Sequence, residues 1–409
     1  MAKIAIIGSG IAGLVAARNA KQQGHHVTLF EKLASPGMGA HGFKLQVDGH
    51  QILGDLPSRM FNRELWPSVA RLYDELNIKY EAVSAGQRFL DRDGGRTFSF
   101  NLPVDWAAKL SIATGIGSSP MLKHLQRLQQ QSSEELAAGA VEGNFAQYLD
   151  QHGFPSEFSR EFLFPALSAT VCTCSDEAIA QYPAAILLDA MQKIASKDGL
   201  WRVSSGSSAV VSALVQSVDE LRCSTNVTSV IEDAGAAIVS FEGAEQQFDR
   251  VIVATQANHV AQICSELPED IQTVMGSFKY EDVSVIVHTD RQFMPQDERE
   301  WSVFNFETSQ ARSMCTVWMN KFHTQWPQVG PVFQTIKPLQ EPSPDSIVCS
   351  VNLQRPVVTT ASNALWQSLE QINQRDSRIK FCGSYAVAGI PLLESAVISA
   401  QRVAVPFVC

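Results

Sequence analysis

Apolar and polar positions at the start of the chain predict a strand, a helix and a second strand. Residues 4–7 are all apolar and run into Gly8, which is typical of a buried parallel strand. Apolar residues then recur at helical spacing over residues 11–20, and Gly24 provides a helix stop. The stretch HHVTLFEK returns to a strand-like pattern that ends in an acidic residue. This order predicts a βαβ unit and therefore an α/β fold with a parallel sheet.

Three glycines stand between the first strand and the helix at the spacing G-x-G-x-x-G. In such a turn Gly8 permits the tight bend, Gly10 lets the backbone approach a pyrophosphate, and Gly13 lets the helix pack on the strand. The helix N-terminus then presents free N–H groups to the phosphates. Glu31 ends the second strand, where its carboxylate can accept both hydroxyls of an adenosine ribose. The motif predicts a dinucleotide with a free 2′-hydroxyl, which leaves FAD and NAD open.

The middle of the chain separates into a helical part and a mixed part. Apolar residues at helical spacing predict helices within 65–77, 119–139 and 184–199. Strand-like runs follow at 283–290 and 313–320. These segments lie outside the dinucleotide-binding unit, so we expect them to build a second domain.

Composition limits the partners of this chain of 409 residues. The formal net charge is −10 and there is no dense Lys/Arg block, which argues against a nucleic-acid partner. No apolar run is long enough for a membrane-spanning helix, and glycines interrupt the start where a signal peptide would continue, so we expect a cytoplasmic protein. Cys172 and Cys174 are the one close pair of cysteines and lack further ligands at metal-binding spacing, so we expect no metal site.

The far end of the chain distinguishes between the two dinucleotides. The stretch IKFCGSYAVAGIPLLESAVISAQRVA reads as a strand over 379–382, a turn at Gly383 and a helix from about Pro391. It resembles the C-terminal flavin-binding segment of the flavin-containing amine oxidase superfamily, which includes phytoene-desaturase-like enzymes. The segments EKLASPGMGAHGF, GDLPSRMFNRELWPSVARLYDELNI, DGLWRVSSGSSAVVSAL, NVTSV and FDRVIVATQANHV resemble other parts of that family in the expected order. The nearest resemblance is to bacterial FAD-binding proteins loosely labelled amine oxidases.

This resemblance implies non-covalently bound FAD. It also implies that the helix N-terminus at the E-G-A-like stretch points at the flavin and stabilises negative charge on the reduced ring. The cofactor-binding residues expected from the motif and the resemblance together are Gly8, Ser9, Gly10, Ile11, Ala12, Gly13, Glu31, Lys32, Gly39, Ala40, His41, Val227, Ala254, Thr255, Gly383, Ser384, Leu393, Glu394 and Ala396.

The resemblance further implies a discontinuous, Rossmann-like FAD-binding domain with an inserted α+β substrate domain. We expect the FAD-binding domain to comprise residues 1–65, 200–262 and 345–409. The substrate domain then comprises residues 66–199 and 263–344.

The cofactor of this family carries the chemistry, and hydride transfer to the flavin is its usual reaction. Two departures bear on the substrate: Ser284 stands where amine oxidases usually place a lysine, and Leu392 stands where some place a cage tyrosine. We expect a flavin-dependent oxidoreductase that oxidises a C–N bond of a small or medium-sized, largely apolar organic substrate, with oxygen or another electron acceptor. The alternatives are a C–C desaturase or dehydrogenase acting on a lipid or cyclic precursor, and a non-catalytic FAD-binding protein.

Two side chains are candidates for contact with the substrate. Arg59 lies in the segment that resembles the part of the family beneath the flavin, where it can anchor an anionic group or form an ion pair. Tyr385 follows the C-terminal glycine turn and can face the flavin or simply pack. His288 ends a predicted strand, where we expect a structural histidine.

Overall fold

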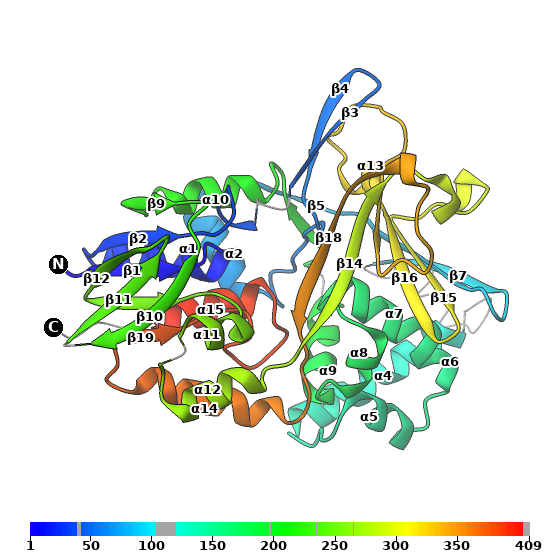
Figure 1. The fold of residues 1–409 in the computed structure, drawn as a ribbon. Coiled ribbons are helices and arrows are strands. Elements are labelled where there is room, and N and C mark those ends of the chain that lie inside the picture. The colour runs from blue at the N-terminus through cyan, green and yellow to red at the C-terminus, as the bar shows by residue number, and fades with distance from the viewer. Residues whose placement is uncertain (39–41, 103–119, 196–197, 234, 265, 404–409) are drawn as a thin grey trace.

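The chain is built around two sheets that lie side by side (Figure 1). The computed structural model describes residues 1–409 except 39–41, 103–119, 196–197, 234, 265 and 404–409. The first sheet is parallel, with strand order β19-β13-β1-β2-β9. Helix α1 (Ile11–Gln22) joins β1 to β2, which confirms the predicted βαβ unit and α/β fold. The strands are β1 (Lys3–Ile7), β2 (His26–Phe30), β9 (Glu220–Arg222), β13 (Arg250–Val253) and β19 (Ile379–Phe381).

Strand β1 buries side chains on both faces of this sheet, which explains why its sequence is apolar without alternation. Ile4 and Ile6 pack in a cluster with helices on one face, whereas Ala5 and Ile7 pack with an antiparallel ribbon on the other. We call this assembly the dinucleotide half. Its further elements are helices α2 (Pro67–Glu75), α10 (Ser207–Val215), α11 (Ala257–Ile263), α12 (Glu269–Ser277), α14 (Ser362–Gln374) and α15 (Leu393–Val403), and ribbon strands β10 (Val227–Asp233), β11 (Ala236–Phe241) and β12 (Ala244–Phe248).

The second sheet has seven strands in the order β18-β14-β17-β16-β15-β6-β7. Its neighbours are antiparallel except for β15 and β6, which are parallel. The strand-like runs at 283–290 and 313–320 correspond to β14 and β16. The strands are β6 (Ala85–Asp91), β7 (Arg96–Leu102), β14 (Tyr280–His288), β15 (Phe304–Ser309), β16 (Arg312–Trp318), β17 (Phe333–Ile336) and β18 (Ile347–Pro356).

A layer of helices covers one face of this sheet (Figure 1). We call the sheet and these helices the substrate half. The predicted helices at 119–139 and 184–199 correspond to α4 and α9. The helices are α4 (Pro120–Ala137), α5 (Phe145–Gln151), α6 (Ser156–Phe158), α7 (Phe164–Ala166), α8 (Asp176–Gln181) and α9 (Ala184–Ile194), with π-helical turns at Ser159–Leu163 and Leu167–Cys172.

Short elements complete the described chain. The hairpin β3 (Phe43–Val47) and β4 (His50–Gly54) projects from the top of Figure 1, and β5 (Tyr80–Ala82) pairs with β8 (Trp201–Val203). Helix α13 (Met319–Phe322) follows β16, and 3₁₀ turns occur at Arg291–Phe293, Glu298–Glu300 and Pro344–Ser346. None of the described helices has the length and apolarity required to cross a bilayer.

The boundaries between the two halves differ from the sequence expectation at two elements. Strand β18 lies beyond the expected boundary at 345, yet it pairs along its length with β14 of the seven-stranded sheet. Helix α2 falls within the expected substrate segment, yet Val69 and Leu72 pack with Val397 of α15 in the core of the dinucleotide half. Strand pairing and helix packing, which join residues far apart in sequence, decide both assignments.

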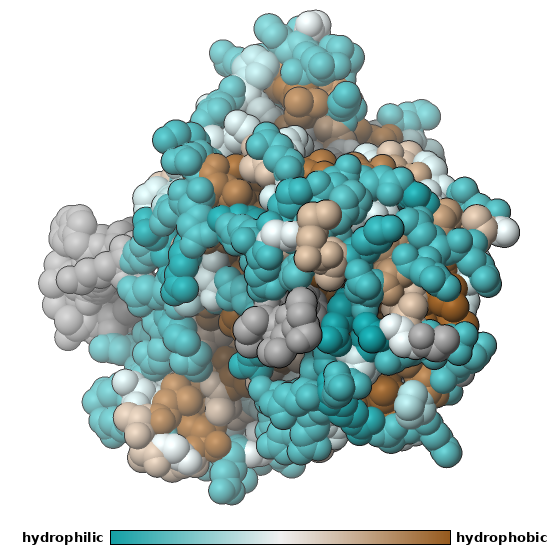
Figure 2. All heavy atoms as spheres, turned by 90° about the vertical axis from the view of Figure 1, so that its left-hand side faces the viewer, coloured by the Kyte–Doolittle hydropathy of each residue, from teal (hydrophilic) through white to brown (hydrophobic). Residues whose placement is uncertain are grey.

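Figure 2 shows the face formed by the dinucleotide half, where hydrophilic residues predominate and hydrophobic patches are small and separated. This face presents no broad apolar surface.

Candidate cofactor and substrate site

A cavity of about 310 Å³ lies where the two halves meet, and we call it the central cavity. Its wall on the dinucleotide side comes from the turns after β1, β13 and β19, which are neighbours in the parallel sheet. Ligand sites of open parallel sheets lie beyond the carboxyl ends of the strands, as here. The predicted residues that line the central cavity are Gly10, Ile11, Ala12, Arg59, Ala254, Thr255, Gly383, Ser384, Tyr385, Leu393 and Ala396.

The glycine turn has the geometry that a dinucleotide pyrophosphate requires. Gly8 has a φ of +98°, and a Cβ on Gly13 would lie 1.9 Å from the carbonyl oxygen of Gly8. A Cβ on Gly10 would meet no atom within 4 Å and would point into open space at the cavity wall. Gly10 is also the N-cap of α1 and offers no side-chain cap, so the first N–H groups of the helix are available to an anion. These residues therefore fit a bound pyrophosphate.

Glu31 lies at the end of β2 beside the glycine turn, as the motif predicts. Its Oε2 accepts hydrogen bonds from the backbone N–H and the hydroxyl of Ser9, at 3.0 and 2.6 Å, and its Oε1 accepts one from the N–H of Leu33 at 2.9 Å. A carboxylate has about four acceptor positions, so Glu31 retains capacity for ribose hydroxyls. Ser9 is buried and accepts from the N–H of Gly37, so it holds the glycine turn to the following loop.

The remaining predicted cofactor residues lie around this core of the site. The N–H of Thr225, two residues before Val227, donates to the carbonyl of Glu31, so Val227 begins its strand near the ribose-binding position. Gly8, Ser9, Gly13, Glu31, Lys32, Val227 and Glu394 do not line the central cavity itself. Gly39, Ala40 and His41 lie outside the described residues.

Glu394 contacts another helix. Its Oε1 accepts the N–H of Ser68 at 3.0 Å, and its Oε2 accepts the N–H of Val69 at 2.9 Å. These N–H groups belong to the first turn of α2, so Glu394 caps that helix. The sequence correctly indicates a helix N-terminus here, but the carboxylate is directed at protein backbone. Leu393 and Ala396 are the members of the stretch that reach the cavity.

Tyr385 lines the central cavity but is held by packing. Its ring lies edge-on to Phe278 with centroids 5.0 Å apart, and Trp366 donates to its carbonyl oxygen at 3.0 Å. Its hydroxyl is buried and has no hydrogen-bond partner among the described residues. Burial, reinforced by nearby Tyr280, raises the pKa of the Tyr385 phenol well above its ordinary value. The geometry favours a packing role.

Arg59 lines the cavity from the dinucleotide side. Its Nη1 donates to the hydroxyl of Ser207 at 3.0 Å and lies 3.9 Å from Oδ1 of Asp55. Burial lowers the pKa of the Arg59 guanidinium, and Asp55 opposes that effect. Asp55 in turn accepts the N–H of Ser207 at the start of α10, so the arginine belongs to a small ion-paired group.

The seven-stranded sheet supplies the opposite, mostly apolar wall. Residues directly opposite in an antiparallel ladder share one face. Leu353 faces Val283, Ile336 faces Val285, and both Leu353 and Ile336 line the cavity. The lining residues on this face are Phe304, Val317, Gln334, Ile336, Leu353 and Arg355.

Ser284 and His288 occupy the other face of that sheet. Ser284 stands opposite Asn352, which is the neighbour of Leu353 along β18. Because successive residues of a strand point to opposite faces, Ser284 lies on the face away from the cavity. His288 is buried, and its Nε2 lies 2.8 Å from the hydroxyl of Thr335. Its Nδ1 accepts the N–H of Asp290, so the ring is neutral, and burial lowers the pKa of His288 to about 4. It is a structural histidine, as expected.

Two features of the wall were not foreseen from the sequence. The π-helical turn Leu167–Cys172 and the left-handed residue Thr173 bring Ala169, Thr170 and Val171 to the cavity. Such π-turns often occur at functional sites. Thr170 and Val171 also line a smaller adjoining space of about 40 Å³, which extends the apolar wall toward Leu200. No sequence pattern distinguishes this π-turn from an ordinary helix.

Arg355 is the second unforeseen residue. It lies two residues after Leu353 along β18, so both side chains are on the cavity face of the sheet. The sequence signal was a charged residue two positions after an apolar residue of a strand, but recognising it requires the register of β18.

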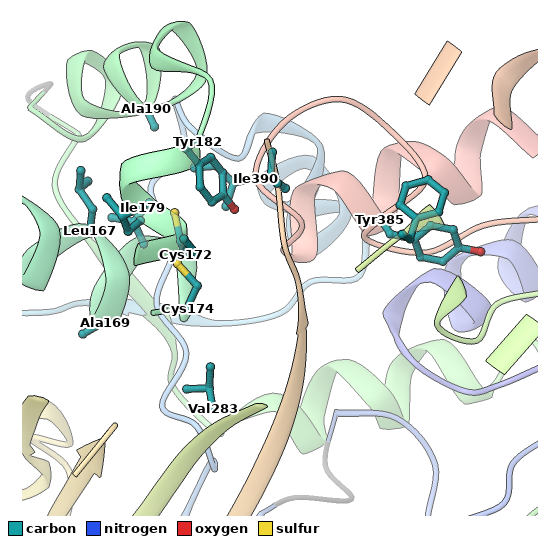
Figure 3. Close-up of a cluster of buried hydrophobic side chains, with 14 of the residues drawn as sticks. Leu167, Ala169, Cys172, Cys174, Ile179, Tyr182, Ala190, Val283, Tyr385 and Ile390 are labelled. Atoms are coloured by element: carbon teal, nitrogen blue, oxygen red, sulfur yellow. The ribbon is translucent and has the colours of Figure 1, made fainter. Parts of the chain in front are cut away.

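Cys172 and Cys174 lie nearby in a buried cluster with Tyr182 (Figure 3). Among the described residues no three His, Cys, Asp or Glu side chains come together as a metal site.

Comparison with known proteins decides the family. A sequence model described as flavin containing amine oxidoreductase matches residues 11–348, which is most of the chain. The chain belongs to this family. The flavin-containing amine oxidoreductase described here is thus an FAD-dependent oxidoreductase, which confirms the expectation of FAD over NAD and of an enzyme. No curated protein matches the sequence.

Solved structures share the fold of this flavin-containing amine oxidoreductase over essentially its whole length. A fatty acid isomerase from P. acnes has a TM-score of 0.70 at 15% identity, covering 100% of this chain and 99% of that one. Putrescine oxidase bound to putrescine has a TM-score of 0.65 at 17% identity, and cyclohexylamine oxidase from Brevibacterium oxydans has 0.64 at 14%. Both of these comparisons cover 98% of each chain. At these identities the likeness concerns the fold.

Proposed function

We propose that this enzyme removes a hydride from a largely apolar small molecule and that the bond it oxidises is C–N, giving an imine from an amine. The observation that carries this proposal is the composition of the central cavity. Among the described residues that line it there is no Asp, Glu, His or Lys. The cavity therefore offers an apolar wall and hydrogen-bonding groups but no ordinary general base.

The lack of a base favours a C–N bond over a C–C bond. When a hydride leaves the carbon next to a neutral amine, the nitrogen lone pair stabilises the cation, and the N–H proton can pass to solvent. A saturated C–C bond offers no such lone pair, and its oxidation requires a group to take up a proton. Bound FAD supplies the hydride acceptor.

The residues of the chain have separable roles in this proposal. We infer that the turns at Gly10, Ala254 and Gly383 hold the cofactor against the dinucleotide side of the cavity. Leu353, Ile336 and their neighbours on the sheet exclude water and hold the apolar part of the substrate. The nearby guanidiniums of Arg59 and Arg355 disfavour a second cation, so an amine bound there is kept in its neutral, reactive form.

One observation favours the alternative of C–C desaturation. Ser284 replaces the lysine that family members with amine oxidase activity usually carry, and it lies on the sheet face opposite to the cavity-lining Leu353. An enzyme without that lysine is less suited to fast reaction with oxygen and can use another electron acceptor. We keep a desaturase as the second candidate for this reason.

Anaerobic flavin reduction tests the proposal. The purified enzyme would be mixed without oxygen with primary and secondary amines of increasing apolar size, and bleaching of the flavin absorbance followed. We expect saturable reduction by an amine and none by its alcohol or hydrocarbon analogue. If a saturated hydrocarbon or a saturated cyclic ketone reduces the flavin and no amine does, the enzyme is instead a desaturase. Readmission of air then separates an oxidase, which recovers in seconds, from a dehydrogenase.

A further inference from the structure

The guanidinium of Arg355 lines the central cavity without an ion-pair partner. Its Nη2 donates to two backbone carbonyl oxygens, that of Cys172 at 3.3 Å and that of Pro391 at 3.1 Å. Its Nε is buried and has no hydrogen-bond partner among the described residues. No carboxylate of the part of the chain that the structure describes forms an ion pair with it. A cation that lines a cavity without an ion-pair partner is incompletely stabilised, and an anion in the cavity would stabilise it.

The carboxylate that stands opposite Arg355 in the sheet is engaged elsewhere. Glu281 stands opposite Arg355 across the β14–β18 pair and favours its charged form from a distance. The Oε1 of Glu281, however, accepts the backbone N–H of Ser175 at 2.8 Å. Burial is the main influence on Arg355 and lowers its pKa. Since arginine stays protonated in proteins, the charge persists and is only weakly compensated.

A second cation strengthens the preference for an anion. The charges of Arg355 and Arg59 are close enough that Arg355 lowers the pKa of Arg59. Asp55 compensates Arg59, at an Nη1–Oδ1 distance of 3.9 Å, but no such group compensates Arg355. The described lining of the cavity contains both arginines and no acidic side chain. The local field therefore favours a negative group beside Arg355.

The position of Arg355 in the sheet shows what accompanies that negative group. Arg355 lies opposite Glu281 on β14, whereas Gln334 lies opposite Val287 at the other end of the same cavity face. Six residues of strand span about 20 Å. The apolar residues Leu353 and Ile336 lie between these two ends. A ligand held at Arg355 would extend its apolar part along this wall.

We propose that Arg355 is a substrate-binding residue, and that the substrate of this enzyme carries a carboxylate next to an apolar body. The planar guanidinium matches a carboxylate through paired hydrogen bonds. The inference rests on the proposed function in that it takes the central cavity to be the substrate site. It holds whether the bond oxidised is C–N or C–C.

Ligand binding by the FAD-loaded enzyme tests this inference without turnover. The probes are hexanoate and hexanamide, which share an apolar chain and differ in charge. Binding would be followed by the change in flavin absorbance and independently by calorimetry. We expect hexanoate to bind at least tenfold more tightly than hexanamide, and its affinity to fall as salt is raised. Equal affinities, or no binding of hexanoate, would overturn the proposal.

Variants assign the preference to one residue. Arg355→Gln should weaken hexanoate binding at least tenfold and leave hexanamide binding unchanged, and Arg355→Lys should restore part of the loss. Arg402→Gln removes one positive charge from an exposed position of α15 and should bind hexanoate as the parent does. If Arg355→Gln does not fold, Arg355→Lys still decides, because a lysine cannot reproduce the paired hydrogen bonds and should bind hexanoate less tightly. Unaltered hexanoate affinity in both Arg355 variants would contradict the proposal.

The reduced flavin is the other possible source of the anion. If Arg355 serves the flavin, Arg355→Gln should lower the flavin reduction potential while hexanoate affinity stays the same, and that result would overturn the substrate role. Failure of the proposed C–N reaction is distinguishable from failure of this inference. In that case no amine bleaches the flavin, yet hexanoate still binds in an Arg355-dependent way.

Discussion

The carboxylate of Glu394 accepts the backbone N–H of Val69 at 2.9 Å, which joins the start of α15 to the start of α2. Its other oxygen accepts the N–H of Ser68. Both N–H groups would otherwise be unsatisfied at a partly buried helix end. We expect Glu394→Gln to lower the free energy of unfolding by about 1–3 kcal/mol, because the amide nitrogen cannot accept one of these bonds. Urea denaturation of the FAD-free protein measures the change.

The control for that substitution is Glu370→Gln on α14. Glu370 is exposed and forms a surface ion pair with Arg402 at 3.6 Å, so its replacement should change stability by no more than about 0.5 kcal/mol. Equal effects of the two substitutions would show that Glu394 does not act as a cap.

Substitution by alanine at two glycines of the same turn should affect different properties, the stability of the fold at Gly13 and the affinity for FAD at Gly10. Gly13→Ala places a Cβ 1.9 Å from the Gly8 carbonyl and should destabilise the fold by about 3 kcal/mol. Gly10→Ala meets no protein atom within 4 Å and should leave the stability of the FAD-free protein nearly unchanged. It nevertheless occupies the approach of the pyrophosphate, so FAD affinity should fall about tenfold or more. Thermal unfolding with and without FAD separates the two effects.

The contrast between these variants contains its own control, because both add the same methyl group within four residues. Tight FAD binding by Gly10→Ala would show that the pyrophosphate lies elsewhere than the structure implies.

Removal of the Tyr385 hydroxyl should be harmless. The hydroxyl is buried without a partner among the described residues, so Tyr385→Phe relieves a desolvation penalty. We expect the free energy of unfolding to stay the same or rise by up to about 1 kcal/mol, with an unchanged rate of flavin reduction. Tyr385→Ala, by contrast, should destabilise the protein because it empties the contact with Phe278. A large loss of flavin reduction in Tyr385→Phe alone would give the hydroxyl a catalytic role.

His288 should make the fold sensitive to acid. Burial lowers its pKa to about 4 from the ordinary 6.5, so between these values the unfolded chain binds a proton that the folded chain does not. Stability from this group is complete above pH 6.5 and is lost as pH falls toward 4, by about 3 kcal/mol in total. His288→Gln should flatten this part of the stability–pH curve, measured by urea denaturation. Gln51→Asn, which exchanges one neutral side chain for another at an exposed position of β4, should leave the slope as it is.

The sequence predicted those parts of the site whose signals are local. Gly8, Gly13 and Glu31 follow one another within a single βαβ unit, so their spacing predicts the turn and a dinucleotide, but not which dinucleotide. Gly383 and the helix after it were recognised by resemblance to a family segment. What escaped prediction depends on distant pairing. Glu394 caps a helix through the N–H of Ser68, which lies 326 residues earlier in the chain, so no local pattern reveals this contact.

Arg355 shows the same limit in the sheet. Whether a strand residue faces a cavity depends on register, and a shift of one residue would bring Gln354 to the wall instead. The register is set by the pairing of β18 with β14, which are about seventy residues apart in the chain. The π-helical turn that carries Val171 is likewise a result of packing, since its composition suits an α-helix equally well.

The order of strands in the parallel sheet has a consequence for biosynthesis. The turn after β1 is synthesised long before β19 and its turn at Gly383. Since both turns form the wall of one cavity, a growing chain cannot complete that cavity until β19 and the turn after it have been synthesised. We therefore expect polypeptides truncated before β19 to accumulate without bound flavin.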